Sequence, residues 1–453
     1  MEGTPRPTVT SRRGKSFHAV INDVVIALTR EHKQEYFPPT YRISNPHLHL
    51  TKGERNHSTP PRGQHHNPKA KGLWENMADE SVEEPEARPY RSWVRGDISL
   101  NPSSSSWHPS DRCRTLDELG YLLIPQFATS EEVRSMKMEM VRLVQNEWFP
   151  GGKDTTAVFR TDDKQIQAQG HSDYFLDSAD RIHYFAEVDA VDPTTGALKP
   201  EYLSNKNNTK NKIRALNKAG HGLHLQQNSS AFASYTTSSK VGSLLRELGW
   251  VDPVVPQSMY IFKQASGVKG GGEVTSHQDS TFLHTEPRQT CIGLWLALDD
   301  ATLTNGCLWV RPGSHHEKLR RRFVRNPKHF GSALAYDDNN DTAAGVGDRS
   351  EPQMIFNSVN INNNVPWEGK LPDNSLSAPE CKGLYDAGFI PVPCSAGDLV
   401  AFVGTMDHLS LPNTSNGARH TFQLHCVEGE GAGVTWSKTN WLQYPAESTF
   451  MKL

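Results

Sequence analysis

Five short runs of aromatic and branched residues follow one another from about residue 255 onward, and each is bounded by Gly, Pro, Asn or Asp. Runs of this kind indicate β-strands. No helical pattern alternates with them, so they favour antiparallel pairing over the βαβ order of a parallel sheet. We therefore predict an α+β fold built on a double-stranded β-helix, a jelly-roll or cupin-like barrel with helices packed outside. The runs are QSMYIFKQ, IGLWLALDD, GCLWVRPGSH, GDLVAFVG and RHTFQLHCV.

A helix–strand–helix pattern precedes these strands and marks the start of the folded domain, near residue 112. The apolar residues Tyr121–Ile124 predict a short strand. Thr129 and Glu132 match a capping box, in which each side chain satisfies a backbone N–H of the other residue. The residues that follow repeat on one helical face, which indicates core packing rather than a cofactor contact; they are Val133, Met136, Met140, Leu143 and Val144.

The N-terminal part of the chain has a different composition from the rest. Residues 1–72 contain 12 Lys and Arg against 5 Asp and Glu, and residues 73–111 are acidic and rich in serine. Such segments do not bury enough apolar surface to offset the cost of ordering the chain. We predict a disordered, low-complexity extension at 1–111 and one domain at 112–453. Residues 17–28 have helical apolar spacing, which fits either a short helix on this tail or a weak organellar presequence.

Charge and cysteine usage exclude several classes of protein. The net charge of −3 gives no general attraction to nucleic acid or to an anionic membrane, and no apolar run is long enough to span a bilayer. Scattered cysteines without a CxxC pair indicate buried thiols in a reducing compartment. We expect a cytoplasmic monomer that acts on a small molecule, with organellar import as the weaker alternative. The cysteines are Cys113, Cys291, Cys307, Cys381, Cys394 and Cys426.

The pattern His-x-(Asp/Glu) is the first sign of a metal site, but it is not specific. With 20 His and 51 Asp+Glu in 453 residues, chance predicts about two occurrences, and the chain has four. The pair that belongs to a metal site must therefore be identified from its sequence context and from a third ligand elsewhere in the chain. Residues two apart on a strand face the same side, so one such pair on a barrel strand can point inward. The four pairs are His171/Asp173, His277/Asp279, His284/Glu286 and His315/Glu317.

A second histidine and an arginine complete the candidate site around His277 and Asp279. A non-haem Fe(II) that activates O₂ is typically held by two His and one carboxylate, with other positions open. In GDLVAFVGTMDHLS, His408 lies just beyond a buried strand. Arg419 opens the last strand, and a guanidinium inside a barrel requires an anionic partner such as a dicarboxylate cosubstrate. The alternatives are a polar cluster without metal and a structural ion pair at the arginine.

These motifs resemble the phytanoyl-CoA dioxygenase family of Fe(II)/2-oxoglutarate-dependent oxygenases. The resemblance is carried by HQDSTFLHTEPRQTCIGLWLALDDATLTNGCLWVRPGSH, followed by GDLVAFVGTMDHLS and Arg419. Within the family the chain is most similar to the group of phytanoyl-CoA dioxygenase domain-containing proteins. The segments AQGHSDYFLDSADRIHYFAE, NKAGHGLH, VVPQSMYIFKQ and TWSKTNWLQ extend the resemblance over roughly residues 115–445.

The resemblance implies a set of cofactors and site residues. It implies that Fe(II) is held by His277, Asp279 and His408, that 2-oxoglutarate and O₂ are cosubstrates, and that Arg419 binds the distal carboxylate of 2-oxoglutarate. It implies no catalytic side chain beyond the metal ligands. Four further residues match positions that line the cosubstrate pocket, namely Lys218, Met259, Gln278 and Trp295. The alternative for Met259 and Trp295 is core packing, and the alternative for Lys218 is a surface charge.

A polar, Asn-rich stretch separates Asp279 from His408. We predict a loop insertion at about 325–390 that forms surface loops or a lid over the substrate entrance. The whole pattern predicts a dioxygenase that hydroxylates a small or lipid-like substrate and releases succinate and CO₂. Two alternatives are a sensor or scaffold that binds metal or 2-oxoglutarate without turnover, and an epimerase or desaturase that uses the same site.

Overall fold

The computed structural model describes most of the chain after residue 109. The described residues are 110–150, 156–160, 169–203, 209–265, 272–331, 347–358 and 382–453. They all belong to the second of two compact units, Glu54–Leu453. The first unit, Met1–Gly53, lies outside the described residues. The expected extension at 1–111 also lies outside them, except for residues 110 and 111, and so does the helix expected at 17–28.

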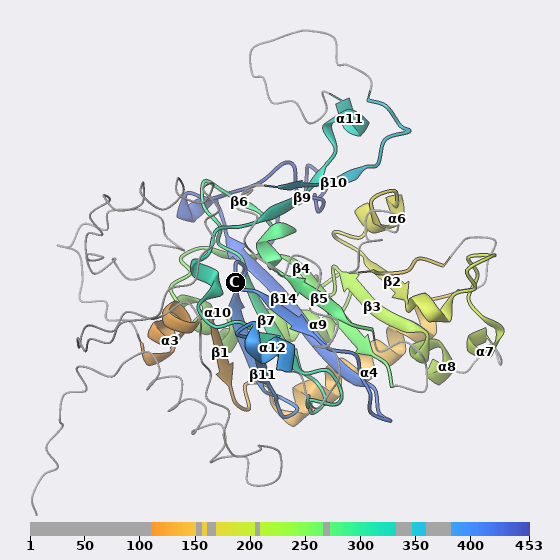
Figure 1. Ribbon diagram of the computed structural model, residues 1–453, viewed down its shortest axis with the longest axis horizontal. Helices are drawn as coiled ribbons and strands as arrows, with labels where there is room; N and C mark the ends of the chain where they lie inside the picture. The colour runs from red at the N-terminus through yellow and green to blue at the C-terminus, as the bar shows by residue number, and fades with distance from the viewer. Residues whose placement is uncertain are drawn as a thin grey trace, which may run out of the picture. The chain divides into compact units, whose positions relative to one another are not determined.

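The larger of two antiparallel sheets carries most of the predicted strands (Figure 1). The sheet has eight strands, and one of them, β16 (Met451–Lys452), pairs with β4 (Pro253–Lys263) off the main order. In spatial order the sheet contains β1 (Tyr121–Ile124), β12 (Leu399–Val403), β7 (Ile292–Ala297), β14 (Arg419–Glu428), β4 (Pro253–Lys263), β3 (Leu216–His221) and β2 (Ile182–Ala186).

The smaller sheet completes the barrel. It contains, in spatial order, β11 (Ile390–Val392), β8 (Leu308–Val310), β13 (His408–Ser410) and β5 (Val274–His277). The chain crosses from the larger sheet to the smaller one between β4 and β5 and again between β7 and β8. It then returns through β12, β13 and β14, which alternate between the two sheets. This connectivity is that of a jelly roll, so the prediction of a double-stranded β-helix is confirmed.

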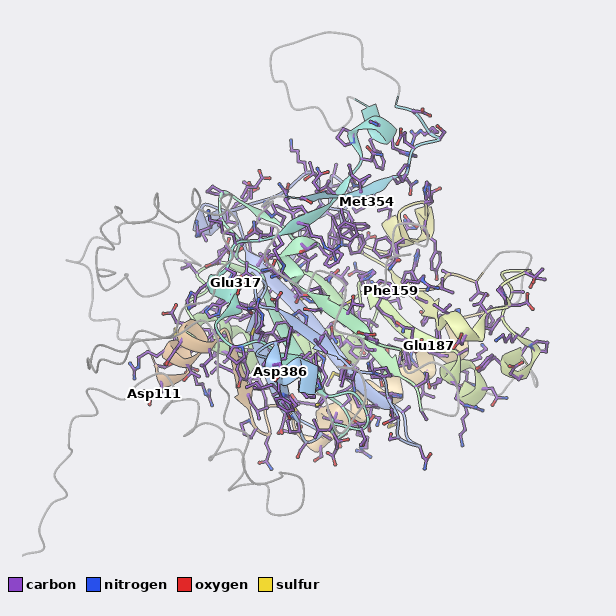
Figure 2. All side chains as sticks on the ribbon, in the orientation of Figure 1. Asp111, Phe159, Glu187, Glu317, Met354 and Asp386 are labelled. Carbon is purple, nitrogen blue, oxygen red and sulfur yellow. The ribbon has the colours of Figure 1, made fainter. Side chains whose placement is uncertain are left out.

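Two further strand pairs lie outside these sheets. Strands β9 (Arg321–Arg325) and β10 (Met354–Ser358) pair at the top of the view in Figure 1, and β6 (Thr285–Glu286) pairs with β15 (Thr435–Trp436). Met354, labelled in Figure 2, is buried in a cluster that also contains Phe323. These aromatic and aliphatic contacts attach the β9–β10 pair to the barrel.

The described part of the expected insertion at 325–390 contains regular structure. It includes β10 and the short helices α11 (Pro327–Phe330) and α12 (Lys382–Asp386). Residues 332–346 and 359–381 lie outside the described ranges. The lid over the substrate entrance therefore stays a prediction.

Helices from the part of the chain before β4 flank the barrel at its outer side. The helices before β4 are α3 (Asp111–Leu119), α4 (Ser130–Glu147), α6 (Asp173–Leu176), α7 (Pro200–Leu203), α8 (Thr209–Arg214), α9 (Ser230–Thr236) and α10 (Ser239–Glu247). Phe232 of α9 packs against Tyr260 of β4 and Phe422 of β14, with ring centroids 6.0 and 4.8 Å apart. Aromatic side chains on one face of the larger sheet thus hold the helical layer.

Helix α4 begins with the capping box that its sequence predicts. The Thr129 hydroxyl accepts a hydrogen bond from the Glu132 backbone N–H at 3.2 Å, and the Glu132 carboxylate accepts one from the Thr129 N–H at 2.8 Å. The predicted apolar face of the helix is buried in the core. This confirms its assignment to packing.

Strand β14 shows how the barrel separates its two faces. Phe422 faces the helices, whereas Arg419 and His425 face the barrel interior, where they contact Trp295 and Asp279. Side chains alternate along a strand, so one strand supplies both an apolar outer face and a polar inner face. The polar inner face is where the candidate site lies.

The described cysteines fit the prediction of buried thiols. Cys113, Cys291, Cys307, Cys394 and Cys426 are all buried, whereas Cys381 lies outside the described residues. In the part of the chain that the structure describes, no helix combines the length and apolar character that crossing a bilayer requires.

Candidate metal centre

Two histidines on neighbouring strands of the smaller sheet form the base of the site. His277 is the last residue of β5 and pairs in register with His408, the first residue of β13. Their imidazole centroids are 4.2 Å apart. The strand pairing therefore joins two residues that are far apart in the sequence.

The third member, Asp279, is placed differently from the expected arrangement. We expected His277 and Asp279 to face inward from one continuous strand. Instead β5 ends at His277, and Asp279 is the first residue of a 3₁₀ turn, Asp279–Thr281. The turn is anchored by a hydrogen bond from the Ser280 N–H to the Gly404 carbonyl at 2.8 Å. The chain folds back over the strand end, and this brings the carboxylate to the histidines.

The three side chains converge on one point. Asp279 Oδ1 lies 3.4 Å from His277 Nε2 and 3.6 Å from His408 Nε2, and one ligand atom from each residue lies within 4.8 Å of the others. Among the described residues they are the only group of three or more His, Cys, Asp or Glu side chains gathered in this way. Two imidazoles and one carboxylate on one side of an ion form the donor set typical of non-haem Fe(II).

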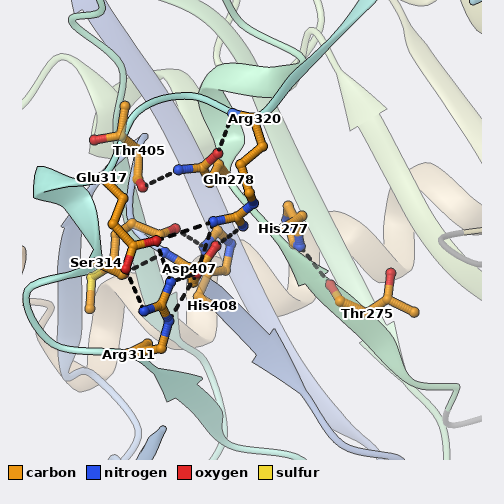
Figure 3. A network of polar contacts seen from close by, with 11 residues as sticks. Thr275, His277, Gln278, Arg311, Ser314, Glu317, Arg320, Thr405, Asp407 and His408 are labelled. Atoms are coloured by element: carbon orange, nitrogen blue, oxygen red, sulfur yellow. Dashed lines mark hydrogen bonds and ion pairs between the residues drawn. The ribbon is translucent and has the colours of Figure 1, made fainter. Parts of the chain in front are cut away.

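Backbone carbonyls orient both imidazoles for metal binding. His277 Nδ1 donates to the Thr275 carbonyl at 2.8 Å, and His408 Nδ1 donates to the Met406 carbonyl at 3.1 Å (Figure 3). A carbonyl only accepts, so the proton is on Nδ1 and the lone pair on Nε2 faces the site. Burial lowers the pKa of His408 to about 4, which keeps this ring neutral and able to coordinate at pH 7.

The carboxylate of Asp279 is ionised in its buried position. Burial alone would raise its pKa, but the neighbouring His425 and His408 together with the hydrogen bond from His425 hold the pKa well below its usual range. Its second oxygen, Oδ2, contacts His425 Nε2 at 3.0 Å. Our sequence-based prediction did not include His425; the signal was its even spacing from Arg419 on the same strand, which places both on the inner face.

Arg419 is a buried cation without an anionic partner among the described residues. Its side chain is 2% exposed, and it donates to the Gly306 carbonyl and to the Thr421 hydroxyl. Its Nε is buried without a hydrogen-bond acceptor. Burial lowers the pKa of Arg419 to about 10, so the group is charged at neutral pH. A free donor on a buried guanidinium fits an anionic ligand such as a dicarboxylate.

Lys218 is also buried, so the alternative of a surface charge is wrong. The side chain is 1% exposed, and its ammonium lies over the Phe159 ring at 3.3 Å from the centroid. The ammonium donates a hydrogen bond to His221 Nε2 at 3.0 Å. Burial lowers the pKa of Lys218 well below its ordinary value. The aromatic rings and the imidazole around this group bring no negative charge, so a nearby anion would favour its protonated form.

The other residues expected at the cosubstrate pocket fall into two groups. Met259 and Trp295 lie on either side of Gln423 in one cross-strand row of the larger sheet, and the Trp295 ring faces the Arg419 guanidinium at 5.3 Å. Gln278 is held by the protein at both ends of its amide: Nε2 donates to the Thr405 carbonyl at 2.8 Å and Oε1 accepts from a backbone N–H at 3.2 Å. Its contact with cosubstrate stays a prediction.

An ionic network supports the site from the side of β13 (Figure 3). Asp407 is fully buried and forms ion pairs with Arg311 and Arg320. Arg311 also forms a bidentate pair with Glu317 at 2.6 and 2.7 Å. Because Asp407 directly precedes the ligand His408, this network fixes the backbone that presents the ligand.

A small cavity of about 10 Å³ opens beside the ligands. It is large enough for about one water molecule. Its lining combines the strand end at the metal site with the first residues of β9, and it consists of Ser276, His277, Gln278, Thr281, Arg320 and Arg321.

The remaining His-x-(Asp/Glu) pairs serve structural contacts. His284 Nε2 contacts the Gln289 side chain at 3.2 Å, and His315 Nε2 donates to the Asp117 carbonyl at 2.9 Å. Asp173 accepts a hydrogen bond from Gln353 at 2.5 Å. None of these residues belongs to a group of potential metal ligands within the described ranges.

Comparison with known proteins places this site in a family. The family model described as phytanoyl-CoA dioxygenase matches residues 116–421. The rat protein "Phytanoyl-CoA dioxygenase domain-containing protein 1" is 37% identical over 341 residues, which are 75% of this chain and 96% of the relative. The rice protein "Phytanoyl-CoA dioxygenase 1" is 36% identical over 333 residues, 74% of this chain and 93% of the relative.

One solved structure similar to this chain is the non-haem α-ketoglutarate-dependent epimerase SnoN from nogalamycin biosynthesis. The TM-score is 0.41 at 13% sequence identity, and the match covers 75% of this chain and 90% of that chain. The family assignment rests on the sequence matches, and the family model includes all three candidate ligands. The chain therefore belongs to the phytanoyl-CoA dioxygenase family, whose oxygenases use Fe(II), 2-oxoglutarate and O₂.

Proposed function

We propose that this protein is an Fe(II)- and 2-oxoglutarate-dependent dioxygenase that hydroxylates a C–H bond of a small or lipid-like substrate and releases succinate and CO₂. The observation that carries the proposal is the combination of three converging ligands with a buried, incompletely paired arginine on the same inner face. A structural polar cluster needs only the first of these features. An anion-binding oxygenase site needs both.

The protein residues divide the work of the reaction. When bound, Fe(II) supplies the one-electron chemistry with O₂ that amino-acid side chains lack. His277, Asp279 and His408 would hold the ion from one side, because their free ligand atoms face a common point and their other polar atoms are already engaged. Positions away from these three ligands stay available for cosubstrate and O₂.

The cations of the inner face would orient the cosubstrate. The planar fork of Arg419 matches the geometry of a carboxylate, and its burial removes competing water. Lys218 lies on β3, one strand beyond β4, in the row that includes Ile261 and Thr421. It would add positive potential to the same end of the pocket. A substrate C–H bond would enter from the side of the small cavity next to His277.

Release of succinate from 2-oxoglutarate tests the proposed function. Purified protein with Fe(II), ascorbate and 2-oxoglutarate in air is expected to form succinate slowly without substrate and faster with a productive one. The variant Asp279→Ala is expected to lose the succinate formed by the wild type. If the wild type binds both ligands but forms no succinate, the protein is a sensor or scaffold instead.

A further inference from the structure

The carboxylate of Asp279 is divided between two environments. Oδ1 faces the ligand imidazoles of His277 and His408 at 3.4 and 3.6 Å. Oδ2 faces His425 Nε2 at 3.0 Å, on the side of the larger sheet. Asp279 and His425 are both buried, so solvent does not compete for either oxygen.

A second side chain determines which nitrogen of His425 carries the proton. An ionised carboxylate only accepts hydrogen bonds, so a proton on His425 Nε2 is required for this contact. Nδ1 then has a lone pair, and the Gln257 amide Nε2 lies 3.0 Å from it as the donor. Gln257 and His425 are register partners on β4 and β14, and both are buried. The strand pairing thus presents His425 to Asp279 in one tautomer.

The strand on the other side of β14 leaves room for this arrangement. Gly293 of β7 is the register partner of His425. A Cβ atom built at Gly293 would lie 3.2 Å from Asp279 Oδ2 and 2.7 Å from the Phe402 ring. Any larger residue at this position would displace the carboxylate or the ring. The space around Oδ2 is therefore shaped for one carboxylate oxygen and one imidazole donor.

We infer that His425, oriented by Gln257, is a positioning residue that commits Asp279 to binding the metal through Oδ1 alone. A carboxylate that binds through both oxygens occupies two coordination positions, and one of them is then lost to cosubstrate or O₂. By holding Oδ2, His425 keeps that position open. The inference rests on the proposed function, since it assigns a role to a neighbour of the same metal site.

Two substitutions separate hydrogen bonding from simple packing. In His425→Gln the side-chain amide places an N–H donor close to the former Nε2 position. In His425→Leu the volume is retained but the donor is lost. His425→Asn is a polar variant whose amide is too short to reach Asp279, and it replaces the leucine variant if that protein does not fold. His420→Leu is the matched control, because His420 lies on the same strand but bonds to Tyr260 on the outer face at 2.8 Å.

The readouts are the affinity for Co(II), measured by anaerobic calorimetry, and the visible absorption of bound Co(II), which reports coordination number. Loss of an outer partner of a metal ligand typically weakens metal binding about 10- to 100-fold. We expect this loss and a changed spectrum for His425→Leu and His425→Asn. His425→Gln and His420→Leu are expected to bind Co(II) like the wild type, with its spectrum.

The outcomes distinguish this inference from the proposed function. If His425→Leu or His425→Asn binds Co(II) with wild-type affinity and spectrum, the positioning role is overturned, while the oxygenase proposal stands provided the wild type converts 2-oxoglutarate. If His425→Gln is as impaired as the leucine variant, the donor is not what matters and the inference is also overturned. If the wild type binds no divalent metal, the proposed function itself fails.

Discussion

Arg419 shows at the scale of one residue how a buried charge indicates a ligand. Its two terminal nitrogens donate to Gly306 and Thr421, but its Nε has no acceptor within the described residues. Leaving a buried donor unsatisfied costs about 1–3 kcal/mol, and more for a charged group. An anion that binds there would recover this free energy, which explains why such a residue is compatible with a stable barrel.

Replacement of this arginine by lysine is the first prediction. Arg419→Lys retains the positive charge but loses the planar fork, so one of two hydrogen bonds to a carboxylate is lost. A hydrogen bond to a charged group contributes roughly 1.5–3 kcal/mol, which corresponds to an increase of about 10- to 100-fold in the KM for 2-oxoglutarate. Steady-state rates of succinate formation at varied 2-oxoglutarate give this KM, and we expect a smaller change in kcat.

The control for this change is Arg325→Lys on β9, where the arginine donates to the Asn440 and Trp441 carbonyls instead. It should leave the KM for 2-oxoglutarate unchanged. An unaltered KM in Arg419→Lys would remove this residue from the cosubstrate site.

The sequence indicated some site residues better than others for a physical reason. His277 and His408 were predictable because each lies at the end of a strand in a distinctive run of residues. His425 has no such context, and in the sequence only its even spacing from Arg419 distinguishes it from His420, which packs on the outer face. The spacing places His425 on the inner face, but its contacts with Gln257 and Asp279 depend on strand register and on the fold of the chain.

At the scale of elements, residue type decided what could be predicted. Strands β4, β7, β12 and β14, and even the short β1 and β8, are runs of branched and aromatic residues, which indicate strands. Strands β5 and β13 have the largely polar sequences VTSH and HLS and so contain no such run, although they carry two of the three candidate metal ligands. Strands β2 and β3, at one end of the larger sheet, were not predicted, because the pairing of β3 with β4 and of β2 with β3 depends on long-range contacts.

The support of β13 by Asp407 gives a prediction at this scale. Asp407→Asn removes the buried counter-charge that the half-buried Arg311 and the buried Arg320 share. Loss of one partner of a buried ion pair typically destabilises a protein by about 3–5 kcal/mol. Urea unfolding should show a loss of this size together with weaker Fe(II) binding, because His408 follows directly.

The comparison for Asp407→Asn is Glu317→Gln. Glu317 also forms an ion pair with Arg311, but its side chain is more exposed than that of Asp407, at 41%. Exposed pairs contribute roughly 0.2–1 kcal/mol, so a small effect is expected. Equal effects of the two substitutions would show that the network does not depend on burial.

At the scale of the whole molecule, buried histidines make stability depend on pH. Burial lowers the pKa of His224 and His284 to about 3, and of His315 to about 4. In the unfolded chain the same groups titrate near about 6.5. The unfolded state therefore binds more protons between these values, so stability is complete above about pH 6.5 and falls as the pH approaches 4.

The expected result is a lower urea midpoint of the metal-free protein at pH 5 than at pH 7. Each of the three histidines contributes up to about 2 kcal/mol of this loss. Glu187 opposes them, because burial raises its pKa to about 8 and favours the folded state as the pH falls below that value. The variant His224→Gln should show a smaller difference in urea midpoint between pH 5 and pH 7. A wild-type midpoint at pH 5 that equals or exceeds the midpoint at pH 7 would contradict the prediction.

The central claim is that one inner face of this barrel binds Fe(II) and 2-oxoglutarate together. The most direct measurement is an anaerobic titration of the Fe(II) protein with 2-oxoglutarate, followed by visible absorption. The claim predicts a metal-to-ligand charge-transfer band in the wild type that saturates with 2-oxoglutarate. It also predicts no band in His277→Ala and a band only at much higher 2-oxoglutarate in Arg419→Ala. A wild-type protein that binds Fe(II) but shows no band with excess 2-oxoglutarate would contradict the claim.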